Sequence, residues 1–291
     1  MKNISIDSLK VSCSIKLNDL PTLIDVATSE KKKEKQLQKI REKLSKVQDK
    51  MYAHNKYGVL ICLQGMDTAG KDSLIREVFK EFNARGVVVH SFKTPNSNEL
   101  EHDFIWRHYL ALPEKGKFSV FNRTHYENVL VTRLHPEYIV AENIPAATSV
   151  DVLDNAFFDN RMEEINNFEK HIVNNGTIVL KFFLHISNVE QKNRLLRRLR
   201  LKEKNWKFEP GDLKERKLWD EYQWCYQELL NKTSTNFAPW YIIPADDKST
   251  SRLLVAEAIV EELSKYGFKV PELPQKYKAE ISNYKKQLGS E

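Results

Sequence analysis

Cysteine is scarce in this sequence of 291 residues, and its placement excludes several classes of protein. The three cysteines, Cys13, Cys62 and Cys225, are far apart and do not have the spacing of metal ligands. An odd number of widely separated thiols does not predict a disulfide framework, so we expect a protein of a reducing compartment. Cys62 lies inside an apolar run and is expected to be a small core residue.

Long apolar runs are also lacking. None approaches the ~20 residues that a helix needs to cross a bilayer. The first residues, MKNISIDSLKVSCSIKL, contain no continuous apolar stretch of the kind that a secretion signal carries. We therefore expect a cytoplasmic protein with no membrane partner.

A strong excess of one charge is absent too. Lys and Arg together number 46 and Asp and Glu 40, which gives a net charge of +6. Such a mild excess does not by itself indicate a polyanionic partner, because solubility explains it equally well. The chain also lacks internal repeats and Gly/Ser-rich linkers. Its length predicts one large α/β domain or two modest ones, with a substantial core.

A charged segment, from Glu30 to about Tyr52, is the first ordered element that the sequence indicates. Its apolar residues recur three or four positions apart, which gives a helix with one apolar face that can brace the main domain: Leu37, Ile40, Leu44, Val47 and Met51. We therefore divide the chain into an N-terminal extension (1–55), a core (56–270) and a C-terminal tail (271–291).

Beyond this helix, apolar runs alternate with helical patterns. The runs predict five strands at Gly58–Leu63, Val87–Phe92, Phe118–Phe121, Thr177–Leu184 and Trp240–Ile243. The stretches between and after them predict helices at Leu74–Phe82, Glu99–Leu112, Val150–Asn174, Val189–Leu201, Asp212–Leu230 and Arg252–Tyr266. Nearly continuous apolar strands are typical of a sheet covered on both faces. The pattern predicts a doubly wound, parallel, five-stranded sheet with ligands at the carboxyl ends of its strands.

The first predicted strand runs into the segment GMDTAGKDS, and a helix follows. This is a G-x-x-x-x-G-K sequence in the strand–turn–helix context that a phosphate-binding loop requires. Backbone N–H groups and the helix N-terminus can hold a phosphate there, while Lys71 supplies a point charge. The expected phosphate-binding residues are Gly65, Ala69, Gly70, Lys71, Asp72 and Ser73.

The loop departs from the standard pattern, which places Ser or Thr directly after the lysine to hold Mg²⁺. Asp72 occupies that place and Ser73 follows it. Asp67 is a second carboxylate inside a loop that should bind phosphate, and a carboxylate there is explained by a bound metal ion. We therefore expect Asp67 to bind Mg²⁺, or Mn²⁺ in its place; a hydrogen bond that braces the loop is the alternative.

Several blocks of the chain, in order, closely resemble the family-2 polyphosphate kinases. They are GMDTAGKDS, SFKTPNSNELEHDFIWRHYLALP, VFNRTHYENVLVTRLHPEY, NGTIVLKFFLHIS, KNWKF, GDLKER and APWYIIPADDK, and together they span about residues 56 to 265. The resemblance implies a P-loop kinase core with a helical lid (about 188–216), similar to thymidylate kinase. It also implies homo-oligomers, commonly dimers or tetramers.

The activity that the resemblance implies is reversible, Mg²⁺-dependent transfer of a phosphoryl group between inorganic polyphosphate and AMP or ADP, with GMP and GDP as further candidate acceptors. Two alternatives are an ATP-dependent kinase of a nucleoside monophosphate or another small acceptor, and a non-catalytic binder of polyphosphate or nucleic acid. The intact lysine-bearing loop argues against the binder, and we expect no nucleic-acid partner.

The segment after the third predicted strand forms the second side of the active site in this family. Many relatives carry Asp where this chain has Asn122, so Glu127 is expected to take up that charge on the metal ion or on the nucleotide side. Arg123 and Arg133 can direct guanidinium groups at phosphates, or remain solvated surface residues. Lys93, after the second strand, is a further candidate phosphate contact. His125 is expected to be a packing residue, because an ionised phosphate needs no general base.

The richest basic segment runs from Lys192 to Arg200, where P-loop kinases carry their lid. Arg194, Arg197 and Arg198 share one helix face, and Leu195 and Leu199 share another. Closing such a helix would bring arginines onto the transferred phosphate and exclude water. We expect Arg194 and Arg198 to act in catalysis; a solvated charged face is the alternative. The segment 244–248, after the fifth strand, is a candidate contact for adenine or a plain turn.

Overall fold

The computed structural model describes residues 5–290 except 207 and 209. Its centre is an all-parallel sheet of five strands in the order β2-β3-β1-β4-β5. The strands are β1 (Gly58–Gln64), β2 (Val87–Ser91), β3 (Phe118–Asn122), β4 (Thr177–His185) and β5 (Trp240–Pro244). Each begins at the predicted residue and ends within one residue of the predicted end, so the predicted doubly wound fold is confirmed.

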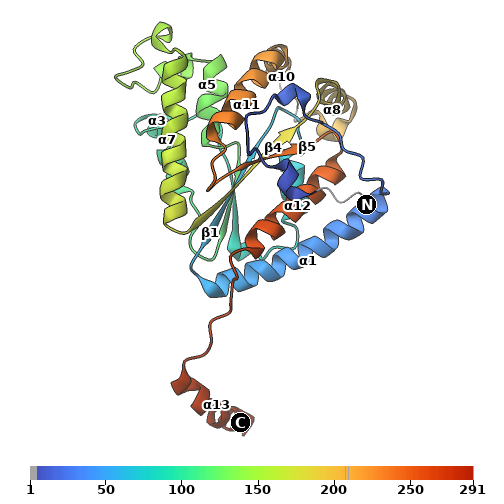
Figure 1. The fold of residues 1–291 in the computed structure, drawn as a ribbon, viewed down its shortest axis with the longest axis vertical. Coiled ribbons are helices and arrows are strands. Elements are labelled where there is room, and N and C mark those ends of the chain that lie inside the picture. The colour runs from blue at the N-terminus through green and yellow to red at the C-terminus, as the bar shows by residue number, and fades with distance from the viewer. Residues whose placement is uncertain (1–4, 207, 209, 291) are drawn as a thin grey trace.

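Helices cover both faces of this sheet (Figure 1). The main helices around the sheet are α1 (Glu30–His54), α2 (Lys71–Val78), α7 (Asn155–Asn174), α8 (Asn188–Arg200), α11 (Trp219–Thr233) and α12 (Lys248–Ser264), and a further helix, α13 (Gln275–Gly289), lies in the tail. Short α-helices are α3 (Ser97–Leu100), α4 (Trp106–Leu110), α5 (Val131–Leu134), α6 (Glu137–Val140), α9 (Lys202–Asn205) and α10 (Gly211–Lys217). Single 3₁₀ turns are η1 (Ile6–Leu9), η2 (Leu17–Asp19), η3 (Ala84–Gly86), η4 (His125–Val129) and η5 (Val150–Val152). No helix within the described residues is long and apolar enough to span a bilayer.

Alternate residues of β1 supply the two halves of the core, as the two-residue period of a strand requires. Val59 and Ile61 belong to the cluster that includes buried side chains of α1, α2 and α12. Leu60 and Cys62 belong to a second cluster with Phe168 of α7 and its neighbours. β1 is therefore buried on both sides, which explains its nearly continuous apolar sequence.

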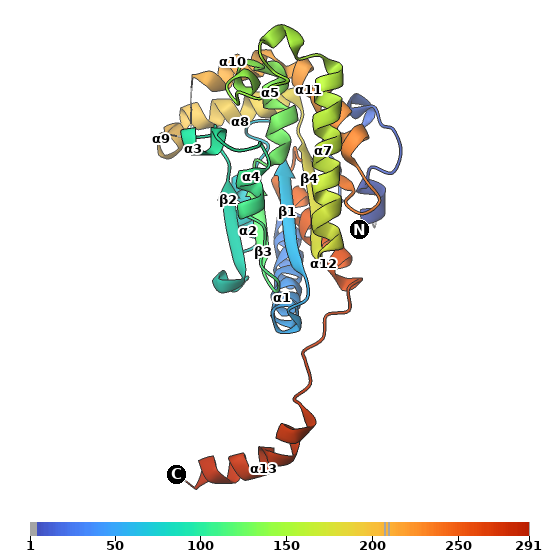
Figure 2. The same cartoon turned by 90° about the vertical axis from the view of Figure 1, so that its left-hand side faces the viewer.

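The N-terminal helix α1 packs on α12 and belongs to the first of these clusters. Its apolar stripe, Leu37, Leu44 and Met51, is fully buried, and Arg41 extends from it to bond Glu77. Residues 30–54 therefore share one core with the sheet. The tail contains α13, which stands away from the rest of the chain at the end of an extended segment (Figures 1 and 2).

Three predicted helices are interrupted in the structure. The stretch 150–174 divides into η5 and α7, because Leu153 and Asp154 between them are not helical. The stretch 99–112 divides into α3 and α4, because the Asp103 carboxylate accepts from the backbone N–H groups of Ile105 and Trp106 and turns the chain there. The stretch 212–230 divides into α10 and α11 at Leu218. The helix predicted at 74–82 begins earlier, at Lys71, because Gly70 takes a left-handed conformation (φ 113°) just before it.

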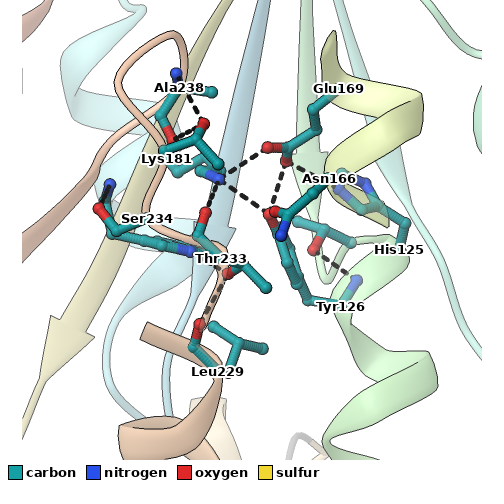
Figure 3. Close-up of polar contacts among 12 residues, drawn as sticks. His125, Tyr126, Asn166, Glu169, Lys181, Leu229, Thr233, Ser234 and Ala238 are labelled. Atoms are coloured by element: carbon teal, nitrogen blue, oxygen red, sulfur yellow. Dashed lines mark hydrogen bonds and ion pairs between the residues drawn. The ribbon is translucent and has the colours of Figure 1, made fainter. Parts of the chain in front are cut away.

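A charged pair is buried between β4 and α7 (Figure 3). The Lys181 ammonium donates to Glu169 Oε2 (2.7 Å), to the Tyr126 hydroxyl (2.9 Å) and to the Thr233 carbonyl (2.7 Å). Glu169 Oε1 accepts from the Tyr126 hydroxyl (2.7 Å) and lies 3.1 Å from His125 Nε2. Burial alone would raise the pKa of the Glu169 carboxyl, but Lys181 and His125 hold it below its usual value. The pair thus ties the η4 turn to β4 and to the end of α11.

We predict that Lys181→Met lowers the free energy of unfolding by about 3–5 kcal/mol, because it leaves the Glu169 charge buried without its partner. The double variant Lys181→Met/Glu169→Gln should lose clearly less, since Gln carries no charge and keeps an acceptor for Tyr126. Urea unfolding, with the slope compared between variants, measures both. A single variant within 1 kcal/mol of wild type would contradict this role.

Candidate active site

The segment Gly65–Ser73 forms a cradle between β1 and α2. Gly65 has φ 151°, and a Cβ there would lie 2.9 Å from the Leu184 carbonyl oxygen, so a side chain has no room. Thr68 takes a left-handed conformation (φ 64°), which is uncommon for a residue with a branched side chain. These conformations curve the chain so that α2 begins directly at Lys71.

Lys71 lies in the curve of the cradle, where its ammonium donates to the Gly65 carbonyl (2.6 Å). Burial lowers the pKa of the Lys71 ammonium, and the nearby Asp67 carboxylate opposes that shift. At the start of α2, the Ser73 hydroxyl donates to the Gly70 carbonyl (2.9 Å). Asp72 accepts from the amide of Asn122 at the end of β3 (2.8 Å). This hydrogen bond joins the start of α2 to the end of β3 across the site.

The chain after β3 supplies the opposite wall. Arg123 takes a left-handed conformation (φ 60°), and its guanidinium lies 3.6 Å from the Asp67 carboxylate. Glu127, in η4, accepts from the Gln64 side chain (3.0 Å), which also donates to Thr124 (3.0 Å). Gln64 was not predicted as a site residue; its polar side chain at the end of an otherwise apolar strand was the available signal.

Arg194 requires a correction, since it was predicted to reach the transferred phosphate from the lid. Its guanidinium is buried and uses all five N–H donors within the protein. They reach the Glu190 carboxylate and the carbonyls of Thr68, Ala69, Ala245 and Asp246 at 2.6–3.0 Å. Arg194 therefore clamps the cradle to the end of β5. The second predicted lid arginine, Arg198, lies 3.2 Å from Asp212 and lines the cavity described next.

A basic cavity of about 460 Å³ opens on one side of the cradle. Its cationic lining comes from the cradle, the chain after β3, α2, α8, α9 and α12: Lys71, Arg76, Arg123, Arg194, Arg197, Arg198, Lys204, Lys248 and Arg252. The acidic residues Asp67 and Asp72 also line it. A cavity with this many cations and so few acids suits a polyanion.

A second cavity, of about 300 Å³, opens on the other side of the cradle and is bordered by aromatic rings. Its lining includes Thr94, Glu127, Val131, His135, Tyr138, Glu215, Tyr222 and Tyr226. Asp67, Lys71 and Arg123 line both cavities. Figure 2 shows α5, α8 and α10 gathered at the carboxyl end of the sheet, where these residues lie.

Two further residues that were predicted to contact phosphate, Arg133 and Lys93, do not line the two cavities beside the cradle. Arg133 lies away from the cradle, with its guanidinium 4.9 Å from the Phe158 ring centre and 4.3 Å from that of Trp224. It lines a separate, open cavity because α5 turns it toward α7 and α11. Lys93 is exposed and lines neither cavity beside the cradle, whereas its neighbour Thr94 lines the second.

Lys248 belongs to the segment 244–248, which was predicted as a candidate contact for adenine or a plain turn; its position as a cation of the basic cavity was not predicted. It begins α12 beside the cradle, and its Cε would lie 3.9 Å from a Cβ on Gly70. Burial lowers the pKa of its ammonium to about 8, and Arg194, Arg197 and Arg252 add to the shift. The preceding carboxylates are occupied elsewhere: Asp246 bonds Ser187 and Thr22, and Asp247 caps α12 and pairs with Lys33. The segment 244–248 therefore contributes a cation.

The family model of polyphosphate kinase 2 matches residues 27–269. The chain belongs to the polyphosphate kinase 2 family. It is 40% identical over 275 residues to an ADP-polyphosphate phosphotransferase of Rhodopseudomonas palustris, covering 94% of each chain. It is 41% identical over 233 residues to an AMP/ADP-polyphosphate phosphotransferase of Meiothermus ruber, covering 80% of this chain and 82% of that one.

Solved structures of polyphosphate kinase 2 have the same fold. The crystal structure of polyphosphate kinase 2 from Arthrobacter aurescens TC1 matches with a TM-score of 0.85 and 30% identity, over 95% of this chain and 96% of that one. The polyphosphate kinase 2 fold therefore extends over nearly the whole chain.

We predict that the affinity of the basic cavity for inorganic tripolyphosphate falls between pH 7 and pH 9, as Lys248 loses its proton. A bound anion favours the charged ammonium, so the lost attraction should cost about threefold to tenfold in affinity. Lys248→Arg stays charged over this range and should give a flatter profile. Calorimetric titration at several pH values measures the difference, with the exposed-site change Lys80→Arg as control. Parallel profiles for Lys248→Arg and wild type would contradict the assignment.

Proposed function

We propose that this chain reversibly transfers a phosphoryl group between inorganic polyphosphate and AMP or ADP, with the cradle as the place of transfer. The observation that carries the proposal is the meeting of two unlike cavities at Asp67, Lys71 and Arg123. One cavity is lined mainly by cations, and the other has three tyrosine rings among polar and acidic residues. A kinase that transfers a phosphoryl group between a phosphate polymer and a nucleotide needs two sites of these kinds, which meet at the place of transfer.

The basic cavity is the proposed polyphosphate site. Polyphosphate carries about one negative charge per phosphate unit, and a series of cations attracts such a chain as it attracts a nucleic-acid backbone, with strong salt dependence. Arg197, Arg198 and Lys204 come from the predicted lid segment and Lys248 from α12, so they surround the cavity from different elements. We propose that Arg198 and Arg123 stabilise the negative charge that develops on the phosphate oxygens in the transition state.

The aromatic cavity is the proposed nucleotide site. Tyr138, Tyr222 and Tyr226 give it flat apolar surfaces that suit a nucleobase and a ribose. Its inner end is formed by Lys71 and Arg123, which would face the phosphate end of the nucleotide. The names of the relatives from Rhodopseudomonas palustris and Meiothermus ruber, which specify ADP and AMP/ADP, support this choice of acceptor.

The chemistry requires positioning and charge neutralisation more than proton transfer. Phosphoryl transfer passes through a loose transition state with little covalent work for the protein. His125 fits this view, because its ring is fully buried against Glu169 and does not line either cavity. We propose that Lys71 and the backbone N–H groups of the cradle orient the phosphoryl group in line between donor and acceptor.

The carboxylates Asp67 and Glu127 fit a magnesium ion that is bound together with substrate phosphates. Mg²⁺ is commonly held by one or two carboxylates plus phosphate oxygens and water, rather than by a cage of protein ligands. Both carboxylates line the aromatic cavity next to Lys71. Within the described residues there is no group of three or more Asp, Glu, His or Cys that would form such a cage. When bound, the ion would neutralise phosphate charge; Mn²⁺ has similar ligand preferences.

We predict that Lys71→Ala lowers turnover with ADP and long-chain polyphosphate by at least ~100-fold, the scale of one preorganised charge-stabilising group. Lys80→Ala, an exposed lysine near the end of α2, should remain close to wild type. The assay contains no ATP, so that ATP formed from ADP, or ADP formed from AMP, reports the reaction. Absence of nucleotide product from wild type would overturn the function, and an ATP-dependent kinase would then be the reading to test. A Lys71→Ala variant with near wild-type turnover would overturn the role assigned to the cradle but not the proposed function.

We predict that Asp67→Asn raises the Mg²⁺ concentration for half-maximal rate by about tenfold or more, because one of two proposed metal-binding carboxylates loses its charge. Chelation of divalent ions should stop turnover of wild type, and added Mg²⁺ should restore it. Asp49→Asn, on the exposed side of α1, is a matched control. An unchanged Mg²⁺ dependence in Asp67→Asn would favour the alternative role, that of a hydrogen-bonding brace.

A further inference from the structure

Three side chains from separate elements meet at the border of the aromatic cavity. His135 Nε2, at the end of α5, lies 3.0 Å from Glu215 Oε1 of α10. The hydroxyl of Tyr222, in α11, donates to Glu215 Oε2 (2.6 Å). Both carboxylate oxygens of Glu215 are thus engaged, and all three side chains line the cavity.

The elements that meet here have different origins in the fold. α5 packs against η4, the turn that carries Glu127 at the cradle. α10 lies at the end of the predicted lid segment, after α8 and α9. The contact between His135 and Glu215, which are 80 positions apart in the sequence, therefore joins the lid to the wall of the active site.

α10 is attached on its other side as well. Arg216, next to Glu215, donates to the Asn188 carbonyl (3.1 Å) and to the side-chain oxygen of Gln191 (2.5 Å) at the start of α8. Gln191 in turn donates to the Asp67 carbonyl of the cradle (3.3 Å). The short helix α10 is thus held on two sides. Arg216 connects it to α8 and, through Gln191, to the cradle, and Glu215 connects it to the border of the aromatic cavity.

The His135–Glu215 contact is partly open to water, since the two side chains are 26% and 32% exposed. Ion pairs in such positions contribute little to the stability of a fold. A weak contact can still decide between two positions of a lid, because a tenfold change in that equilibrium needs only a small free energy. The apparent affinity of a ligand that requires the closed position is its intrinsic affinity multiplied by the fraction of molecules that are closed, so it falls as that fraction falls.

We propose that His135, Glu215 and Tyr222 form a latch that positions α10 over the nucleotide in the aromatic cavity. They are positioning residues, which act by holding the lid and not by contacting the phosphoryl group. The proposal rests on the proposed function in assigning the aromatic cavity to the nucleotide. It implies that losing the latch weakens nucleotide binding and leaves binding in the basic cavity nearly unchanged.

The test is a double-mutant cycle with His135→Ala, Glu215→Ala and the combination, in the full chain. Each single variant should raise the KM for ADP about fivefold to tenfold and change the KM for polyphosphate less than twofold. The double variant should raise the KM for ADP no more than the more affected single variant does, because the effects of mutating two residues of one contact are not additive. Tyr222→Phe removes only the hydroxyl and should give a smaller rise. His171→Ala, an exposed histidine of α7, is the matched control.

Direct binding separates this proposal from the function on which it rests. Calorimetric titration with ADP, and separately with tripolyphosphate, reports each cavity even if wild type shows no turnover. Weaker ADP binding with unchanged tripolyphosphate binding supports the latch, provided that thermal unfolding matches wild type. Equal weakening of both ligands, unchanged ADP binding, or additive effects in the cycle would each overturn it.

Discussion

The buried pair of Lys181 and Glu169 is the interaction on which the arrangement of the active site depends. Two opposite charges in the interior must stay paired and hydrogen-bonded, because a buried charge without its partner costs several kcal/mol of stability. Here they fix β4, α7, the end of α11 and the η4 turn relative to one another. Arg123 precedes that turn and Glu127 lies in it, so the wall opposite the cradle takes its position from charges that never contact a substrate.

The architecture could be predicted from the sequence because the physics that sets it is local and repeated. A strand covered on both faces needs an unbroken apolar run, and each of the five runs began at the observed strand start. The phosphate-binding loop was equally predictable, since only glycine fits at Gly65. Helix interruptions were missed where one side chain, such as Asp103, competes with the helical hydrogen bonds.

Individual roles were harder to predict, because periodicity gives the face of a helix but not the partner of a side chain. Arg194 and Arg198 were treated alike, yet Arg194 clamps four carbonyls and Arg198 borders the basic cavity. Lys248 was considered only as part of a candidate adenine contact, and its place in the basic cavity was not predicted because that cavity is assembled from α8, α9 and α12. Lys181 did leave a signal, as one charged residue inside the apolar run of β4.

Thr68 and Arg123 hold left-handed backbone conformations on opposite sides of the proposed transfer point. For residues with a Cβ, that conformation costs roughly 1–2 kcal/mol each, whether or not a substrate is bound. The two conformations that shape the proposed phosphate-binding edge of the sheet thus lower the free energy of unfolding. Selection for heat resistance alone would favour glycine or asparagine at these two positions, and at Arg123 the gain in stability would remove the guanidinium that faces Asp67.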